Sequence, residues 1–163
     1  MNGRLCGLST GEALSWWCAA TTSNNALVDF TTAPDWADAG MPDFVNNTED
    51  TDQNPISTGC GMAFVSWLAS QGHTLPQVAQ AVVNLGDGGT FADVYAKLTG
   101  NPAHDGWPTF KQAVNALPGG VTGDAPFGAF PCTERRAHTT IKTEPNRPHG
   151  TTTKPRNTPD KTP

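Results

Sequence analysis

The side chains of this sequence that could bind a metal or move a proton are spread thinly along its 163 residues. The four histidines, at positions 73, 104, 138 and 149, stand singly, and the sequence contains no His-Glu-x-x-His motif. That motif places two imidazole ligands and a general base on one helix, so the usual centre of a zinc peptidase is missing. Cys60 has no identifiable histidine partner that would activate its thiol. We therefore assign no catalytic residue in this chain.

Glu12 is the carboxylate with the most informative neighbours. Ser9 precedes it by three residues, the spacing of a capping box, in which the serine bonds a free amide of the first helical turn and the glutamate reaches back. The predicted helix then buries a run of apolar residues: Ala13, Leu14, Trp16 and Trp17. From the residues alone, Glu12 is interpreted as part of a helix cap.

An acidic stretch ahead of the central apolar run invites a calcium interpretation, because Asp50, Asp52 and Asn54 alternate like the first ligands of an EF-hand loop. The match ends there, since position six is Pro55 instead of glycine and position twelve is Gly61 instead of glutamate. A true EF-hand is excluded, and two interpretations stay open. These side chains either form a looser site for a hard cation or hold their own backbone in turns.

The four cysteines, at positions 6, 18, 60 and 132, form no Cys-x-x-Cys pair and have no histidine at zinc-ligand spacing. We expect no zinc site built from them. Cys6 and Cys60 each precede a glycine at the start of an expected helix, and a disulfide between them would fit an oxidising compartment. That bond is one of the three pairings that four cysteines allow. Cys18 is interpreted as a small buried hydrophobic residue.

The densest apolar run, residues 57–68, predicts the central helix, because its side chains are apolar nearly all round. Ser57 or Thr58 would cap its start and Gly72 would end it. Shorter helices with apolar residues at helical spacing follow it: 75–85, 91–100 and 108–117. No segment alternates like a strand. The expected fold class is mainly α, a small bundle of short amphipathic helices with long irregular loops and a disordered C-terminal tail.

Residues 21–43 are rich in Thr, Asn, Ala, Asp and Pro, and we expect them to form an irregular connection laid across the helices. Pro34 and Pro42 would place extended turns in it. A structureless connection of this length is either a functional loop or a sign that its boundaries are wrong.

The chain divides into three parts: residues 1–42 with the first helix and this connection, the helical body 43–120, and a Pro/Thr-rich basic tail, 121–163. Three bases and twelve acids precede residue 134, a net charge of −9, whereas seven bases and three acids follow, a net charge of +4. The tail is too poor in apolar residues to offset its ordering entropy. It lacks aromatic rings among its bases, so we expect no nucleic-acid partner. A solvated tail, an anion-binding tail and a frameshifted translation stay open.

No segment reaches the roughly 20 apolar residues that a membrane-spanning helix needs, so we expect no membrane partner. The N-terminus lacks the apolar core of a signal peptide. The protein is therefore cytosolic, or the start shown is not its native start.

The segment Thr10-Gly11-Glu12-Ala13-Leu14-Ser15 resembles the second metal-binding helix of gluzincin metallopeptidases, the thermolysin-like group, where Asn-Glu-Ala-x-Ser-Asp supplies the third zinc ligand. About residues 3–120, including Asp43-Phe44-Val45-Asn46, are similar to the C-terminal part of a family of secreted, largely uncharacterised bacterial proteins. The first resemblance implies that Glu12 is a carboxylate zinc ligand in a full-length parent, and the second implies secretion. The chain departs from the peptidase motif at Trp16, where an acidic residue would orient a ligand histidine.

Two functional hypotheses follow. In the first, the chain is the non-catalytic helical C-terminal part of a secreted zinc-metallopeptidase-like protein, inactive as given, whose partner is a missing N-terminal catalytic half. That parent would hold zinc, and no cofactor is expected for this chain alone. In the alternative, the chain is a stand-alone extracellular binding or structural domain. It would hold a peptide or glycan with exposed Trp36 and Trp107 and the loop 46–54.

Overall fold

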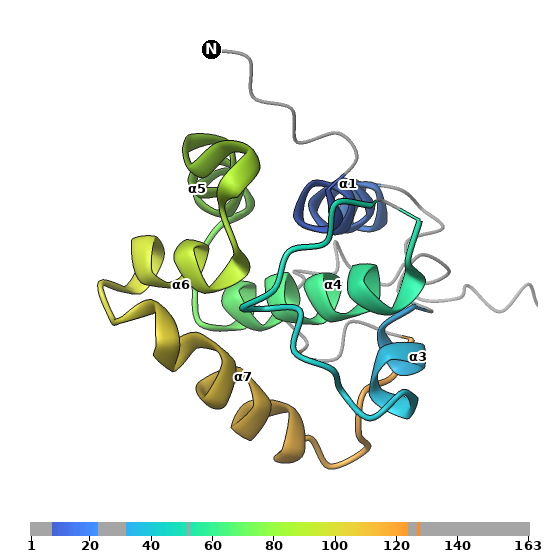
Figure 1. Ribbon diagram of the computed structural model, residues 1–163. Coiled ribbons are helices and arrows are strands. Elements are labelled where there is room, and N and C mark those ends of the chain that lie inside the picture. The colour runs from blue at the N-terminus through green and yellow to red at the C-terminus, as the bar shows by residue number, and fades with distance from the viewer. Residues whose placement is uncertain (1–7, 23–31, 52, 124–126, 128–163) are drawn as a thin grey trace, which may run out of the picture. The chain divides into compact units, whose positions relative to one another are not determined.

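The fold is built from helices, which Figure 1 shows with the labels used below. The computed structural model describes residues 8–22, 32–51, 53–123 and 127, all within one compact unit that spans residues 1–131. The described residues contain no strand, which confirms the mainly α fold class. They form six α-helices and two 3₁₀ turns: α1 Ser9–Thr22, α3 Thr32–Asp38, α4 Pro55–Ser70, α5 Leu75–Leu85, η1 Gly86–Gly88, α6 Phe91–Thr99, η2 Ala103–Asp105 and α7 Gly106–Asn115.

Helix α4 is the centre of this arrangement, as predicted, and every residue from 57 to 68 is buried. Its start was predicted wrongly, because the cap is Asn54, whose side chain accepts a hydrogen bond from the Ile56 amide at 3.0 Å. Pro55 then occupies the first helical position, where a missing N–H costs nothing. The helix ends close to the expected Gly72, which adopts φ +94°.

Two glycines let neighbouring helices approach the α4 backbone closely. A Cβ atom at Gly59 would lie 1.9 Å from the carbonyl oxygen of Thr32 in α3. A Cβ atom at Gly61 would lie 2.4 Å from the Cβ of Ala13 in α1 and 2.7 Å from the Phe91 ring. The sequence Gly-Cys-Gly is therefore a packing site for α3, α1 and the Phe91 ring of α6. The most extensive contacts of α4 are with α3 and α1.

Helix α3 corrects the expectation of an irregular connection between residues 21 and 43. Pro34 was expected to place an extended turn, but it lies in the first turn of α3, where proline is tolerated. Trp36 in this helix is 0% exposed and stacks on Phe110 of α7, with ring centroids 5.6 Å apart. The helix forms because the indole has a core site to fill, a long-range cause that local composition does not reveal.

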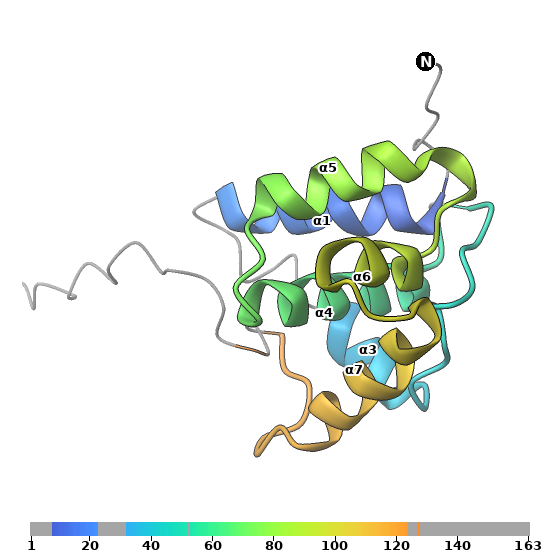
Figure 2. The same ribbon diagram turned by 90° about the vertical axis from the view of Figure 1, so that its left-hand side faces the viewer.

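The remaining helices follow their local signals. The Gln77 side chain accepts a hydrogen bond from the Thr74 amide at 2.7 Å, and Asp93 accepts one from the Thr90 amide at 2.9 Å. Each bond belongs to a capping box at the start of its helix, α5 and α6 respectively. Gly100 ends α6 with φ +76°. Figure 2 shows α5 lying along α1, and these two helices are in contact.

The packed part of the chain extends beyond residue 120, where the tail was expected to begin. Val121 and Phe127 are partly buried against the core, and the Phe127 ring centroid lies 6.3 Å from that of Phe110. Residues 128–163 lie outside the described residues, so the predicted disorder of the tail beyond Phe127 stays a prediction.

We expect Phe127→Ala to lower the free energy of unfolding by about 1–2 kcal/mol, because a partly buried ring gives up part of the burial energy of a core phenylalanine. Urea denaturation followed by far-UV circular dichroism measures this change. Val83→Ala, at a side chain 56% exposed, is the control and should leave the stability nearly unchanged. Equal midpoints for the two variants would show that residue 127 contributes nothing to packing.

Candidate functional site

The Glu12 carboxylate is partly buried on α1 and is held within its own helix. It accepts a hydrogen bond from the indole N–H of Trp16, one turn further along. The predicted capping box with Ser9 does not form, because the Ser9 hydroxyl accepts the Glu49 amide at 3.0 Å. The Ser9 amide also donates to the Glu49 carbonyl at 3.0 Å, so the start of α1 is tied to the acidic loop.

Glu12 has no companion metal ligands in the described part of the chain. No group of three or more His, Cys, Asp or Glu side chains there lies close enough together to hold a metal ion. Tetrahedral zinc needs three or four protein ligands, and a single carboxylate does not meet that need. The zinc role of Glu12 stays a prediction that requires ligands from elsewhere.

Asp43 organises the first half of the acidic loop through its own backbone neighbours. Its carboxylate accepts hydrogen bonds from the amides of Val45 and Asn46, at 3.1 and 2.9 Å, and from the Asn46 side chain at 2.6 Å. The Asn47 side chain donates to the Asp43 carbonyl at 2.8 Å. These bonds are those of turns in which Asp and Asn stabilise the chain that carries them.

Of the three residues proposed as cation ligands, the structure describes Asp50 and Asn54. The Asn54 side-chain oxygen accepts the Ile56 amide and so caps α4. The Asn54 side-chain NH₂ group donates to the Glu49 carboxylate at 2.9 Å. Asp50 is exposed, and Asp52 lies outside the described residues. At Asn54 the geometry therefore favours the turn-and-cap interpretation over a cation site.

The two tryptophans proposed as an exposed binding surface are used for packing. The prediction that Trp36 is exposed is wrong: its ring is buried and its indole N–H donates to the Pro42 carbonyl at 2.9 Å. Trp107 is partly buried, with the Trp36 ring edge-on at 6.4 Å and the Lys111 ammonium 5.4 Å from its ring centroid. The binding role of Trp107 stays a prediction.

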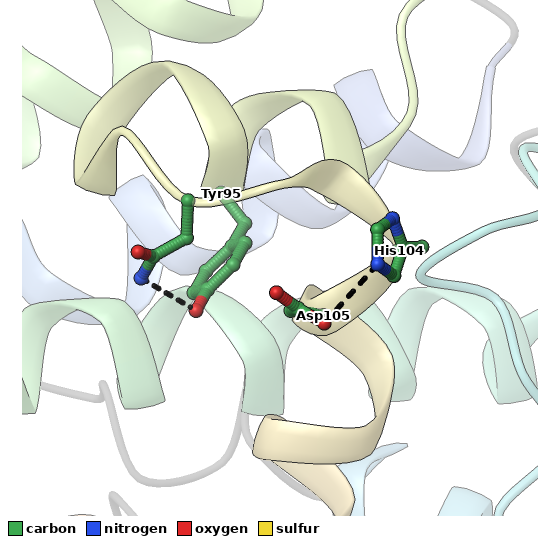
Figure 3. A network of polar contacts seen from close by, with 4 residues as sticks. Tyr95, His104 and Asp105 are labelled. Carbon is green, nitrogen blue, oxygen red and sulfur yellow. Dashed lines mark hydrogen bonds and ion pairs between the residues drawn. The ribbon is translucent and has the colours of Figure 1, made fainter.

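A polar corner joins the end of α6 to α7, and Figure 3 shows Tyr95, His104 and Asp105 in it. The Asn101 side chain donates to the Tyr95 hydroxyl at 3.0 Å, and the Thr99 hydroxyl donates to the Tyr95 carbonyl at 2.8 Å. His104 and Asp105 lie 3.4 Å apart as a surface ion pair, with the histidine side chain 83% exposed. An exposed pair of this kind contributes little energy, so the corner is interpreted as a structural link.

A shallow groove of about 450 Å³ lies between α5 and α6. Side chains from both helices line it: Gln77, Gln80, Ala81, Asn84, Lys97 and Leu98. Sequence reasoning missed this groove, although Gln77, Gln80 and Asn84 recur at positions i, i+3 and i+7 of one helix. That spacing places the amides along one stripe, but only the packing of α6 beside it creates the groove.

No protein-family model, curated protein or solved structure matches this chain. The candidate site must therefore be argued from its residues. Within the described ranges, no helix is long and apolar enough to cross a membrane.

One nucleophile motif also escaped the sequence reasoning. Residues 7–11 read Gly-Leu-Ser-Thr-Gly, the spacing of the Gly-x-Ser-x-Gly nucleophile elbow, in which the serine is exposed for attack. Here Ser9 is only 3% exposed, and its oxygen accepts the Glu49 amide. Neither of the described histidines, His73 and His104, hydrogen-bonds to it. Ser9 therefore has the sequence spacing of a nucleophile elbow, but among the described residues it lacks the exposure and the histidine partner that a nucleophilic serine needs.

Cys60 is a buried thiol of α4 rather than a reactive one. Burial raises the pKa of Cys60, and the nearby Asp43 charge raises it further, so the thiol stays protonated. Burial also raises the pKa of Cys18. The predicted disulfide between Cys6 and Cys60 does not form in this structure, because Cys60 is a free thiol; Cys6 itself lies outside the described residues.

Negative charge prevails over the surface of the described chain. It carries nine carboxylates, at positions 12, 35, 38, 43, 49, 50, 87, 93 and 105, against the two cations Lys97 and Lys111. Lys111 lies over the Trp107 ring, whereas Lys97 lines the α5/α6 groove. Lys97 is therefore the cation of the groove, and Asp93 lies four residues before it on the same helix.

Proposed function

We propose that this chain is the non-catalytic helical C-terminal part of a secreted zinc-metallopeptidase-like protein. The observation that supports this most is the carboxylate of Glu12, fixed on α1 by the Trp16 indole in a chain that has no His-Glu-x-x-His helix. A carboxylate oxygen suits zinc, but it supplies one ligand of a set, and the imidazole ligands belong to the missing catalytic half.

Helix α1 can hold such a carboxylate in place because it is anchored to the core on its other side. Ala13 and Trp17 are buried, and the Trp17 indole N–H donates to the Ser66 hydroxyl of α4 at 3.2 Å. A ligand on a packed helix keeps its position, and the Trp16 hydrogen bond orients it. In this proposal Trp16 holds Glu12, whereas the acid that the peptidase motif has at this position orients a ligand histidine.

We expect the purified chain to bind no stoichiometric zinc and to hydrolyse no casein, and Glu12→Gln should change neither result. Equilibrium dialysis with metal analysis and a casein assay measure this. Zinc-dependent hydrolysis that Glu12→Gln abolishes would contradict the proposal, because the chain would then be active alone.

Sequencing the DNA ahead of the Met1 codon supplies the second test. An in-frame His-Glu-x-x-His supports the proposal, and a stop codon directly upstream contradicts it.

A second candidate function is peptide binding by a stand-alone extracellular domain, and the α5/α6 groove favours it. Three side-chain amides line the groove, and such groups pair well with the N–H and C=O of a peptide backbone. No aromatic ring lines the groove, and Trp36 is buried, so the features that stack on sugar rings are missing there. This favours a peptide over a glycan.

A further inference from the structure

We propose that the groove between α5 and α6 binds a short acidic peptide segment, with Lys97 pairing with a carboxylate of the peptide. This inference rests on the second candidate function, peptide binding, and names the kind of peptide and the residue that selects it. It is independent of any role of Glu12 in zinc binding.

The amides of α5 offer hydrogen-bonding groups that the protein does not use itself. The Gln77 oxygen accepts from the Thr74 amide at 2.7 Å and from its hydroxyl at 2.9 Å, which leaves the Gln77 NH₂ group available. The Gln80 NH₂ group donates to the Asn84 oxygen at 2.9 Å, which leaves the Gln80 oxygen and the Asn84 NH₂ group available. The stripe thus presents two donors and one acceptor, a set that an extended peptide backbone can match.

Lys97 gives the groove a positive charge. Its side chain is exposed near the end of α6, and no carboxylate in the described chain forms an ion pair with it. No carboxylate lines the groove either, although carboxylates outnumber cations on the rest of the described surface. Lys97 is therefore the described cation in the groove, and it would attract a carboxylate of an acidic peptide.

The groove has an apolar floor. Ala81 is buried and Leu98 partly buried between the polar side chains. The groove is shallow and open to solvent, with a volume of about 450 Å³, so a peptide segment would lie along it with one side in water. Small side chains beside the acidic residue, such as alanine, would fit this floor.

The test uses the full chain labelled with ¹⁵N and three eight-residue peptides in which alanine alternates with Glu, Gln or Lys. Amide NMR shifts locate binding and give dissociation constants at low and high salt. We expect the Glu/Ala peptide to shift amides of α5 and α6. The Gln/Ala peptide should bind about fivefold more weakly, and the Lys/Ala peptide more weakly still. High salt should weaken the Glu/Ala peptide most.

Matched lysine variants assign the effect to the groove. Lys97→Gln should weaken the Glu/Ala peptide about fivefold, to the affinity of the Gln/Ala peptide. Lys111→Gln removes the same charge on α7 and should leave the affinity unchanged. Both lysines are charged surface residues, and thermal unfolding of each variant confirms that the fold persists.

The outcomes separate the acidic preference of the groove from peptide binding itself. Equal binding of all three peptides at the groove would overturn the acidic preference while supporting peptide binding. Equal effects of Lys97→Gln and Lys111→Gln would overturn the assignment to Lys97. No binding by any of the three peptides would overturn both the inference and the candidate function on which it rests.

Discussion

Replacing Gly59 with alanine is expected to destabilise the protein by about 2–3 kcal/mol, although alanine is the better helix former. The new Cβ would lie 1.9 Å from the Thr32 carbonyl oxygen and 2.6 Å from its carbon. Both are backbone atoms, so no side-chain rotation relieves the overlap, and α3 must move away from α4. The gain in helix propensity, about 1 kcal/mol, is smaller than the cost of moving a packed helix.

Urea denaturation of the purified variant measures this loss. Gly88→Ala is the matched control, because it makes the same change where no atom lies within 4 Å of the new Cβ. It should leave the stability within about 0.5 kcal/mol of the parent chain. A Gly59→Ala variant as stable as Gly88→Ala would show that α3 does not pack against α4 as closely as described.

The helices that the sequence predicted well are those whose signals are local. Helices α5 and α6 begin at the caps Thr74 and Thr90, and α6 ends at Gly100. Each of these signals acts within a few residues, so it can be recognised without knowing the rest of the fold. Helix α4 was also recognisable, because a helix apolar all round must lie in the core. Its start was misplaced by one turn because Asn54 and Pro55 were interpreted as loop residues.

The parts that could not be predicted depend on contacts between distant segments. Helix α3 exists because Trp36 fills a site against Phe110, which lies 74 residues further along the chain. Ser9 fits a capping box locally, yet Glu49 competes for its hydroxyl from across the fold. The α5/α6 groove likewise needs two helices. A motif within one segment can predict a helix cap or an amphipathic stripe. It does not predict which distant group will bond to the cap or pack against the stripe.

Glu12 shows both sides of this limit. The sequence predicts that Glu12 reaches back toward Ser9 and that Trp16 is buried. Instead Trp16 is 38% exposed and donates to Glu12 from four residues further along the same helix. Whether the Glu12 carboxylate also meets a metal depends on ligands that the described residues do not provide. The sequence therefore identifies the side chain but not its orientation.

Trp36→Ala is expected to cost about 4 kcal/mol of unfolding free energy, the largest single effect proposed for this protein. The indole is 0% exposed, stacks on Phe110 with the ring planes 16° apart, and donates to the Pro42 carbonyl at 2.9 Å. Removing it opens a cavity between α3 and α7 and leaves that carbonyl without its indole donor. Trp36→Phe keeps the ring contact and loses the hydrogen bond, and it should cost about 1–2 kcal/mol.

This series also decides what kind of residue Trp36 is. Replacing a ligand-binding tryptophan on the surface would lower ligand affinity with little loss of stability. Trp16→Ala is the stability reference for such a residue, because Trp16 is 38% exposed and its replacement should cost little stability. A core tryptophan loses stability first, and any loss of binding follows from unfolding. Thermal unfolding of all three variants separates these cases. If Trp36→Ala melts together with Trp16→Ala, the packing of α3 against α7 described above is wrong, and Trp36 returns as a candidate ligand contact.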